Sequence, residues 1–345
     1  MQNHRLTRRA LLAASAGAAA LGCARAGAAS ALRPEFRCEE QPDKGRIRFL
    51  EGDDPILTYN WGDQLAEGVP KDRTRACYCH PLWAPDGTVL TDDFPKDHYH
   101  HRGIFWSWPR MKARGQTVQT WHLDGIHQHH RKWLRRFAAT DSGALDVVNE
   151  WRLDDGACVG QETIRMTFHR ADEVGRAVDF ELAFEAVGGP VELLGAEGKG
   201  YGGFCFRFAP RTAAVITTDA GVQKGDSDNL TPAWADLSAR FGAAAAMAGA
   251  AIFLAPASPC KPTGWTLRYY GFLGPSWPGL KAWTLQPGAP ATLRYRVYVH
   301  RGDAAQGKVA AAYAQYVASA AAEAGPPEKA RRHAAQLRSS TPGYG

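Results

Sequence analysis

Apolar side chains that alternate with more polar ones constrain the fold of this chain more than any other feature. Phe180, Leu182 and Phe184 follow this spacing, which recurs at 104–108, 204–208 and 293–299. Successive side chains of a strand point to opposite faces of a sheet, so a spacing of two marks strands with one buried face. Turn residues separate these segments. We predict an all-β fold with a large antiparallel β-sandwich over residues 46–302.

The ends of the chain carry different signals. Five apolar residues spaced along one helical face predict a helix over 303–325, with Asp303 as its cap: Val309, Ala312, Tyr313, Tyr316 and Val317. Pro326 and Pro327 end this helix. We therefore expect a flexible tail over 326–345. At the other end of the chain we expect a linker over 29–45.

The N-terminal segment has the pattern of an export signal. Arg8 and Arg9 precede an Ala-rich apolar run that ends near Leu21. This run is too short for a membrane span and has the length of a signal core. We predict a twin-arginine signal peptide over 1–28, a periplasmic or secreted mature protein, and no integral membrane span after the signal.

Processing of this segment decides the anchor and the charge. Small residues at 26–28 fit cleavage after Ala28, and a lipid anchor at Cys23 is the alternative. The net charge falls from +6 to +2 on removal of residues 1–28, because four arginines and no acidic residue lie there. No basic run remains, which excludes nucleic acid as an expected partner.

Titratable and aromatic side chains are densest between Asp92 and Trp108. Each unpaired buried polar group costs roughly 1–3 kcal/mol, so these groups form a network, line a cleft or lie on an exposed loop. Histidine supplies acid–base chemistry near neutral pH, and Trp rings stack on flat ligands such as sugars. We predict that His100 and His101 are catalytic and that four neighbours bind substrate: Asp93, Arg102, Trp106 and Trp108. The alternative is a surface loop with core tryptophans behind it.

The histidines also raise the question of a metal. On an extended segment His98 and His100 share one face, and His127 and His129 repeat this spacing. No His-Glu-x-x-His element and no Cys-x-x-Cys pair accompanies them. These four histidines are candidate ligands of a divalent metal, and a structural or catalytic role is the favoured reading. No firm cofactor is predicted.

A second cluster is rich in glycine. The spacing of Gly198, Gly200 and Gly203 matches a dinucleotide-binding pattern, but a strand pattern follows, with no helix to receive a pyrophosphate. We interpret it as a turn from which Glu197 acts as catalytic base and Lys199 stabilises charge. Six residues, here and in two other motifs, complete the predicted substrate contacts: Tyr201, Arg207, Tyr59, Asn60, Trp121 and His122. The alternative is a plain turn whose charges face water.

Five motifs, in this order, resemble one known family: His80-Pro81-Leu82, Leu90–Pro95, His98–Trp108, Tyr201–Gly203 and Tyr270–Phe272. They resemble the secreted domain family labelled "methane oxygenase PmoA". The label is not literal, because a true methane monooxygenase subunit is an integral membrane protein. The resemblance implies a β-sandwich associated with bacterial carbohydrate breakdown, similar to the supersandwich of aldose epimerases. In those enzymes a His and a Glu act as acid and base, which corresponds here to His101 (or His100) and Glu197.

The chain departs from that family at two points. Leu254-Ala255-Pro256 stands where relatives tend to have Asp-His-Pro, and Thr266 follows Trp265 where they often have His. The resulting hypothesis is an exported carbohydrate-active enzyme, a hydrolase, lyase or isomerase, with a sugar or oligosaccharide as substrate. Two alternatives stay open: a non-catalytic carbohydrate-binding β module, and a metal-dependent lyase or oxygenase.

Overall fold

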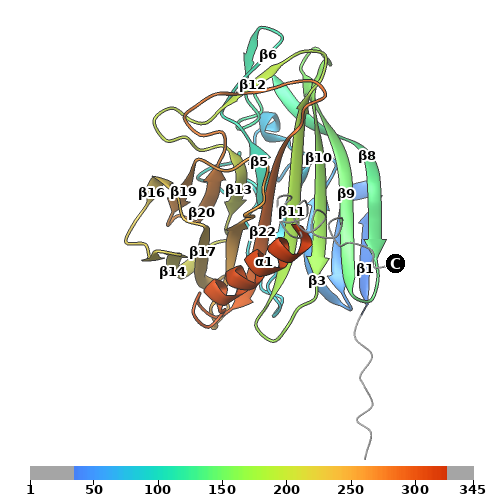
Figure 1. Cartoon of the computed structure of the whole chain (residues 1–345). Helices are drawn as coiled ribbons and strands as arrows, with labels where there is room; N and C mark the ends of the chain where they lie inside the picture. The colour runs from blue at the N-terminus through green and yellow to red at the C-terminus, as the bar shows by residue number, and fades with distance from the viewer. Residues whose placement is uncertain (1–34, 325–345) are drawn as a thin grey trace, which may run out of the picture. The chain divides into compact units, whose positions relative to one another are not determined.

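The computed structural model describes residues 35–324, which form two large antiparallel sheets and one small one (Figure 1). The first sheet has nine strands, in this spatial order: β1 (Phe36–Gln41), β2 (Arg46–Glu51), β3 (Asp54–Asn60), β4 (Tyr78–Leu82), β5 (Ile104–Ser107), β13 (Gly203–Arg207), β20 (Phe272–Ser276), β19 (Gly264–Arg268) and β16 (Ser227–Leu230).

The second large sheet also has nine strands, in this spatial order: β15 (Gly221–Val222), β14 (Arg211–Thr218), β17 (Trp234–Phe241), β18 (Ala248–Leu254), β22 (Ala291–Arg301), β11 (Gly175–Ala186), β10 (Cys158–His169), β9 (Ser142–Leu153) and β8 (Ile126–Ala138). A small sheet contains β21 (Trp283–Leu285), β12 (Val191–Leu194), β6 (Arg110–Ala113) and β7 (Gln116–Val118). Two short 3-10 turns are η1 (Pro42–Lys44) and η2 (Lys71–Arg73).

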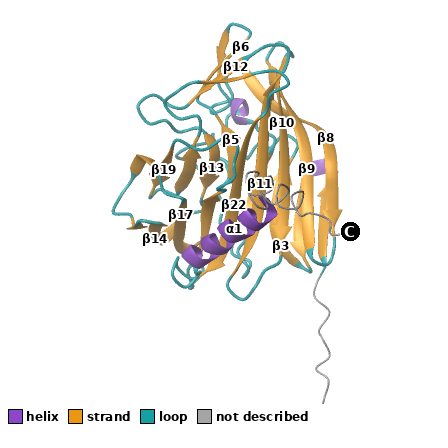
Figure 2. Cartoon of the chain, viewed as in Figure 1, coloured by secondary structure: helices purple, strands orange, loops and turns teal. Residues whose placement is uncertain are grey.

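The hydrophobic core lies between the two large sheets. In β11 the side chains of Phe180, Leu182 and Phe184 are buried, and their neighbours Asp179 and Glu181 are only half-buried. The same alternation runs through β10 and β22. The structure therefore confirms the predicted all-β antiparallel sandwich, in which strands dominate (Figure 2).

One α-helix, α1 (Val309–Ala324), lies across the outer face of the second sheet near β22 (Figure 1). Val309 and Tyr316 pack there against Trp234, Phe253 and Tyr298. A C-terminal helix is confirmed, but it begins at Val309 and not at the predicted 303. Asp303 instead accepts hydrogen bonds from the backbone N–H groups of residues 305 and 306 in a preceding turn.

The predicted linker over 29–45 is corrected within its described part. β1 pairs with β2 from end to end, and Phe36 is buried in the core. Residues 36–44 therefore belong to the sandwich. The signal peptide with Cys23 and the tail from 326 onward lie outside the described residues. Within residues 35–324, no helix combines the length and the hydropathy that a membrane crossing requires.

Candidate functional site

The face of the first sheet that points away from the core carries a second, smaller aromatic cluster. Four adjacent strands, β4, β5, β13 and β20, each contribute one buried residue to it: Tyr78, Phe105, Cys205 and Phe272. Because side chains alternate along β5, Phe105 points to this face and Trp106 points to the core. We call these four residues the floor of the site, because the residues described next pack on them.

Four histidines gather above the floor, and we call His98, His100, His101 and His122 the histidine cluster. Backbone hydrogen bonds from His98 to Pro95 (2.9 Å) and from His101 to His98 (2.8 Å) fold residues 95–101 into turns. The prediction that His98 and His100 share a strand face is therefore wrong. The turns stack the rings of His98 and His101, with centroids 4.6 Å apart. The His100 ring lies edge-on to His101 at 4.5 Å and to His122 at 4.3 Å.

Three further aromatic rings surround the histidine cluster. Tyr270 stacks on His98 with ring centroids 5.0 Å apart. The Trp121 ring lies 5.8 Å from His100 and 5.6 Å from His101. Tyr201 packs on Trp121 at 4.7 Å. The fold thus brings the predicted residues Trp121 and His122, from one loop, and Tyr201, from another, to the loop that carries His98, His100 and His101.

The structure corrects the prediction that Trp106 and Trp108 bind substrate. Both tryptophans are fully buried between the two sheets. Trp108 donates a hydrogen bond from Nε1 to the carbonyl of Trp277 (2.8 Å), and its ring lies 4.9 Å from that of Phe184. The alternation that places Phe105 on the site face places these two rings on the opposite face.

Tyr59 and Asn60 are also corrected, since both are buried in the sandwich. The Tyr59 hydroxyl donates to Oδ1 of Asn149 (3.1 Å), and Asn60 donates from Nδ2 to the carbonyl of His80 (2.8 Å). These contacts join β3 to β9 and to β4. Both residues therefore have structural partners.

Glu197 and Lys199 lie on a tight exposed turn next to Tyr201. The Glu197 side chain is 91% exposed and lies 3.6 Å from Nη1 of Arg110. Lys199 is also exposed. In the part of the chain that the structure describes, neither side chain hydrogen-bonds or ion-pairs with the histidine cluster. Their catalytic roles stay predictions.

Arg102 is fully buried and hydrogen-bonds to backbone carbonyl groups of the turn that carries the histidines. It donates to the carbonyl of His101 (2.7 Å) and to those of Tyr99 and Arg73. Its Nε lies 3.5 Å from Oδ1 of Asp93. This arrangement makes Arg102 a positioning residue and not a direct substrate contact.

Asp93 is the carboxyl group beside Arg102. The Tyr78 hydroxyl donates to its Oδ2 (2.8 Å). Burial raises the pKa of Asp93 to about 7, and the charge of Arg102 and the hydrogen bond from Tyr78 oppose this rise. The carboxyl group therefore exchanges its proton near neutral pH.

We expect an NMR titration of aspartate-labelled protein to show one carboxyl group with a midpoint near pH 7. Asp93 is protonated below this pH and ionised above it, because burial disfavours its charged form. The signal should be absent in Asp93→Asn. In Tyr78→Phe the midpoint should move upward, since the hydroxyl that stabilises the carboxylate is lost. A wild-type midpoint near the ordinary aspartate value would contradict this assignment.

Three of these histidines, His100, His101 and His122, are held in their neutral form. Burial lowers the pKa of His100 to about 2, with contributions from His122 and His98. Burial also lowers the pKa of His101 far below its ordinary value, and lowers that of His122. A neutral imidazole offers one N–H donor and one acceptor nitrogen. His100 and His122 can therefore bind hydroxyl groups at neutral pH without carrying charge.

A surface pocket of about 730 Å³ adjoins the cluster. Tyr270 lines this pocket and stacks on His98. Arg207 also lines it, and its Nη2 donates to both carboxylate oxygens of Asp97 (2.8 and 2.9 Å). Asp97 lies 2.9 Å from Nδ1 of His98, so the predicted residue Arg207 is linked to the cluster through one carboxylate.

The four candidate metal ligands do not form one centre. His98 and His100 lie on the turn before β5, whereas His127 and His129 lie on β8 with ring centroids 6.4 Å apart. His127 faces Asp154 at 3.6 Å. Among residues 35–324, no group of three or more His, Cys, Asp or Glu side chains is placed to hold a metal ion. The spacing of two that suggested a metal is a consequence of the β8 strand at one pair and of a turn at the other.

Several residues of the site were missed by sequence reasoning. The alternation along β5 could have predicted Phe105, because it places this side chain on the face opposite to Trp106. Tyr270 and Phe272 stand in one aromatic motif, but aromatic residues in strands are more often core. Arg75 has no local signal, because its neighbours in space come from distant segments.

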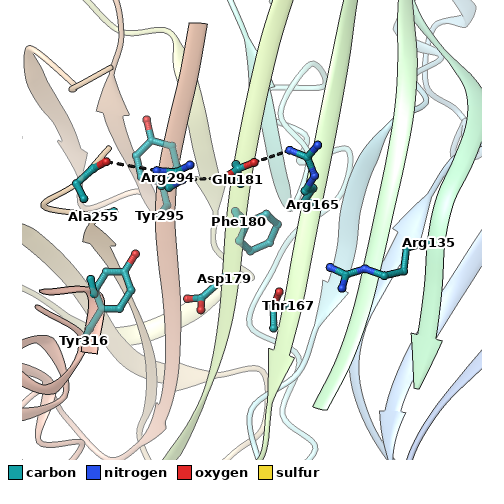
Figure 3. Close-up of a pocket in the computed structure, with 12 residues that line it drawn as sticks. Arg135, Arg165, Thr167, Asp179, Phe180, Glu181, Ala255, Arg294, Tyr295 and Tyr316 are labelled. Atoms are coloured by element: carbon teal, nitrogen blue, oxygen red, sulfur yellow. Dashed lines mark hydrogen bonds and ion pairs between the residues drawn. The ribbon is translucent and has the colours of Figure 1, made fainter. Parts of the chain in front are cut away.

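A different pocket, of about 510 Å³, lies between α1 and the outer face of β10, β11 and β22. Figure 3 shows Glu181 between Arg165 and Arg294, and the ion-pair distances are 2.5 and 2.7 Å. Arg296 likewise forms an ion pair with Asp179 (2.6 Å), and His169 lies 2.6 Å from the same carboxylate. Both central carboxylates of this pocket, Asp179 and Glu181, are thus paired with arginines of the protein itself. We therefore assign the candidate site to the histidine cluster.

Comparison with known proteins places the chain in a family. A family model described as a family of unknown function, DUF6807, matches residues 46–314. The chain belongs to this DUF6807 family. This match confirms the expectation that the chain belongs to an uncharacterised domain family. It does not confirm the label PmoA. The DUF6807 match covers every residue of the histidine cluster.

The DUF6807 domain also resembles solved structures. One is the GH36 alpha-galactosidase AgaA from Geobacillus stearothermophilus, with a TM-score of 0.37 and 12% identity over 77% of this chain and 41% of that chain. Variants of the same enzyme with 1-deoxygalactonojirimycin and with raffinose each give 0.37 and 11% over 78% of this chain and 40% of theirs. The chain thus matches about two fifths of that enzyme's length. No curated protein matches the chain.

Proposed function

We propose that this DUF6807 domain is an exported carbohydrate-active enzyme whose histidine cluster binds a sugar. The observation that carries this proposal is the stacking of the His98 and His101 rings with the partly exposed ring of Tyr270, beside a pocket of about 730 Å³. Export rests on the sequence pattern of residues 1–28. The reaction proposed is hydrolysis, elimination or isomerisation of that sugar.

The side chains of the site have complementary tasks in this proposal. His98 and His100, which are half-buried, exchange hydrogen bonds with sugar hydroxyl groups, and the buried His101 stacks on His98 behind them. The Tyr270 ring, with 38% of the residue exposed, offers its exposed part to the apolar side of a sugar ring. Asp93 holds or releases a proton near neutral pH, which suits general acid–base catalysis.

The binding step is tested by calorimetry on the purified protein with a panel of neutral and acidic mono- and disaccharides. Wild type is expected to bind at least one sugar. Tyr270→Ala should weaken that binding roughly two- to tenfold, the equivalent of about 0.5–1.5 kcal/mol for one ring contact. Phe137→Ala is the matched control, because Phe137 is 46% exposed on β8 and its loss should leave binding unchanged. Equal losses in both variants would contradict the proposal.

A non-catalytic binding module is the second candidate function. It is favoured by the exposed position of Glu197 and Lys199, which leaves the predicted acid–base pair unassembled. Turnover assays on the sugars that bind separate the two functions. The enzyme proposal expects a product, and expects Asp93→Asn to reduce turnover more than binding. Binding of sugars without any product would favour the module.

A further inference from the structure

Arg75 is a buried cation without a counter-ion. It is 2% exposed, and its Nη2 donates to the backbone carbonyl of Thr120. Its Nε and Nη1 are buried and have no hydrogen-bond partner in the described part of the chain, and no carboxylate there forms an ion pair with it. A guanidinium group in such a place is costly unless something else satisfies it.

Arg75 lies at the edge of the histidine cluster. Its guanidinium group lies over the Phe105 ring, 5.3 Å from the centroid. That ring lies 5.9 Å from His101 and 5.8 Å from Trp121. Burial and the nearby charge of Arg102 lower the pKa of Arg75 to about 9, so it remains charged at neutral pH.

A second arginine, Arg207, contacts Tyr270, the residue that stacks on His98. Arg207 lies over the Tyr270 ring, 4.9 Å from its centroid. Only its Nη2 contacts Asp97, and its buried Nε and Nη1 have no hydrogen-bond partner among the described residues. Both Arg75 and Arg207 contribute to the positive field at His101. The site thus has two buried guanidinium groups with unused donors.

We propose that the histidine cluster binds a sugar acid, a carbohydrate whose carboxylate lies in the field of Arg75 and Arg207. This inference rests on the proposed function and names its substrate class. The unpartnered Nε and Nη1 groups of the two arginines supply donors, and charge-assisted hydrogen bonds to a carboxylate are stronger than neutral ones. The histidines and Tyr270 bind the hydroxyl groups and the ring, which a simple anion does not possess.

The test compares each acid with its own neutral ester. Binding of D-galacturonate and D-glucuronate to the purified protein is measured by calorimetry, against their methyl esters and against D-galactose and D-glucose. One of the acids should bind about tenfold or more tightly than its ester, because a charged hydrogen-bonded group is lost in the ester. Raising the salt concentration should reduce this preference.

Variants show which arginines cause the preference. Arg75→Gln and Arg207→Gln should each reduce it to less than threefold, and Arg75→Lys should retain part of it. Arg240→Gln is the control, because this exposed arginine of β17 has no contact with the cluster, and its loss should change nothing. Thermal unfolding of each variant establishes that it is folded. If Arg75→Gln does not fold, Arg207→Gln and the ester comparison still decide the result.

The outcomes separate the two proposals. Neutral sugars that bind as tightly as the acids would overturn the inference and leave the proposed function standing. Acetate that binds as tightly as the uronates would overturn it as well, since the sugar ring would then contribute nothing. A failure of every sugar, acidic or neutral, to bind would contradict the proposed function itself.

Discussion

Replacement of Trp108 by alanine is expected to lower the free energy of unfolding by about 3–5 kcal/mol. The ring is fully buried between the sheets, where it packs against Phe184 and Trp151. Its loss removes apolar contacts, leaves a cavity and leaves the carbonyl of Trp277 without its partner. Urea unfolding followed by fluorescence or circular dichroism measures the change.

The control for this prediction is Trp283→Ala. Trp283 is 44% exposed on β21, so its removal should cost far less than that of Trp108. Sugar binding by the milder variant Trp108→Phe should match wild type, because Trp108 faces away from the histidine cluster. A destabilisation below about 1 kcal/mol in Trp108→Ala would show that the ring is not part of the core.

Replacement of His300 by alanine is expected to cost about 3–5 kcal/mol as well, because it breaks a buried ion pair. His300 Nε2 lies 2.8 Å from Oδ1 of Asp236, and neither side chain is exposed. The imidazole also fits closely between Gly249 and Gly307, where a Cβ atom on either glycine would collide with it. The variant leaves the Asp236 carboxylate buried, with Ser238 as its remaining hydrogen-bond donor.

The His300 pair also has a predictable pH dependence. Burial alone would lower the pKa of His300, but the charge and the hydrogen bond of Asp236 raise it above its ordinary value. A raised histidine pKa gives a stabilisation that is complete below the unfolded pKa of about 6.5 and is lost as pH rises through the folded pKa. The stability difference between wild type and His300→Ala should therefore shrink at alkaline pH.

His169→Ala is the matched control for the buried pair. His169 lies 2.6 Å from Asp179, but its side chain is 39% exposed, so its loss should cost about 1 kcal/mol or less. Urea unfolding of both variants at several pH values gives the comparison. Similar small losses in the two variants would contradict the assignment of His300 and Asp236 as a stabilising buried pair.

Local patterns were sufficient to predict the sandwich. The alternation of Phe180, Leu182 and Phe184 is a direct consequence of strand geometry and needs no knowledge of distant residues. The same reasoning failed at β1, where Phe36 has few apolar neighbours in sequence and is recognised as core only through its pairing with β2. Asp303 caps a turn and not the helix, because residues 304–308 form turns and the helix begins only at Val309.

The site was predicted in part for a related reason. The density of titratable groups before β5 located the histidine cluster, but whether residues 95–101 form a strand or a turn depends on long-range packing. Trp106 and Trp108 were assigned to the site by their chemistry, whereas the alternation along β5 assigns them to the core. Arg75 and Tyr270 reach the cluster only through the fold, so no spacing in the sequence links them to His101.

A crystal structure of the protein soaked with a sugar that binds in calorimetry tests the central claim most directly. We expect a sugar ring against Tyr270, with its hydroxyl groups within hydrogen-bonding distance of the histidine cluster. A sugar bound instead beside Glu197, or in the pocket under α1, with the histidine cluster unoccupied, would contradict it.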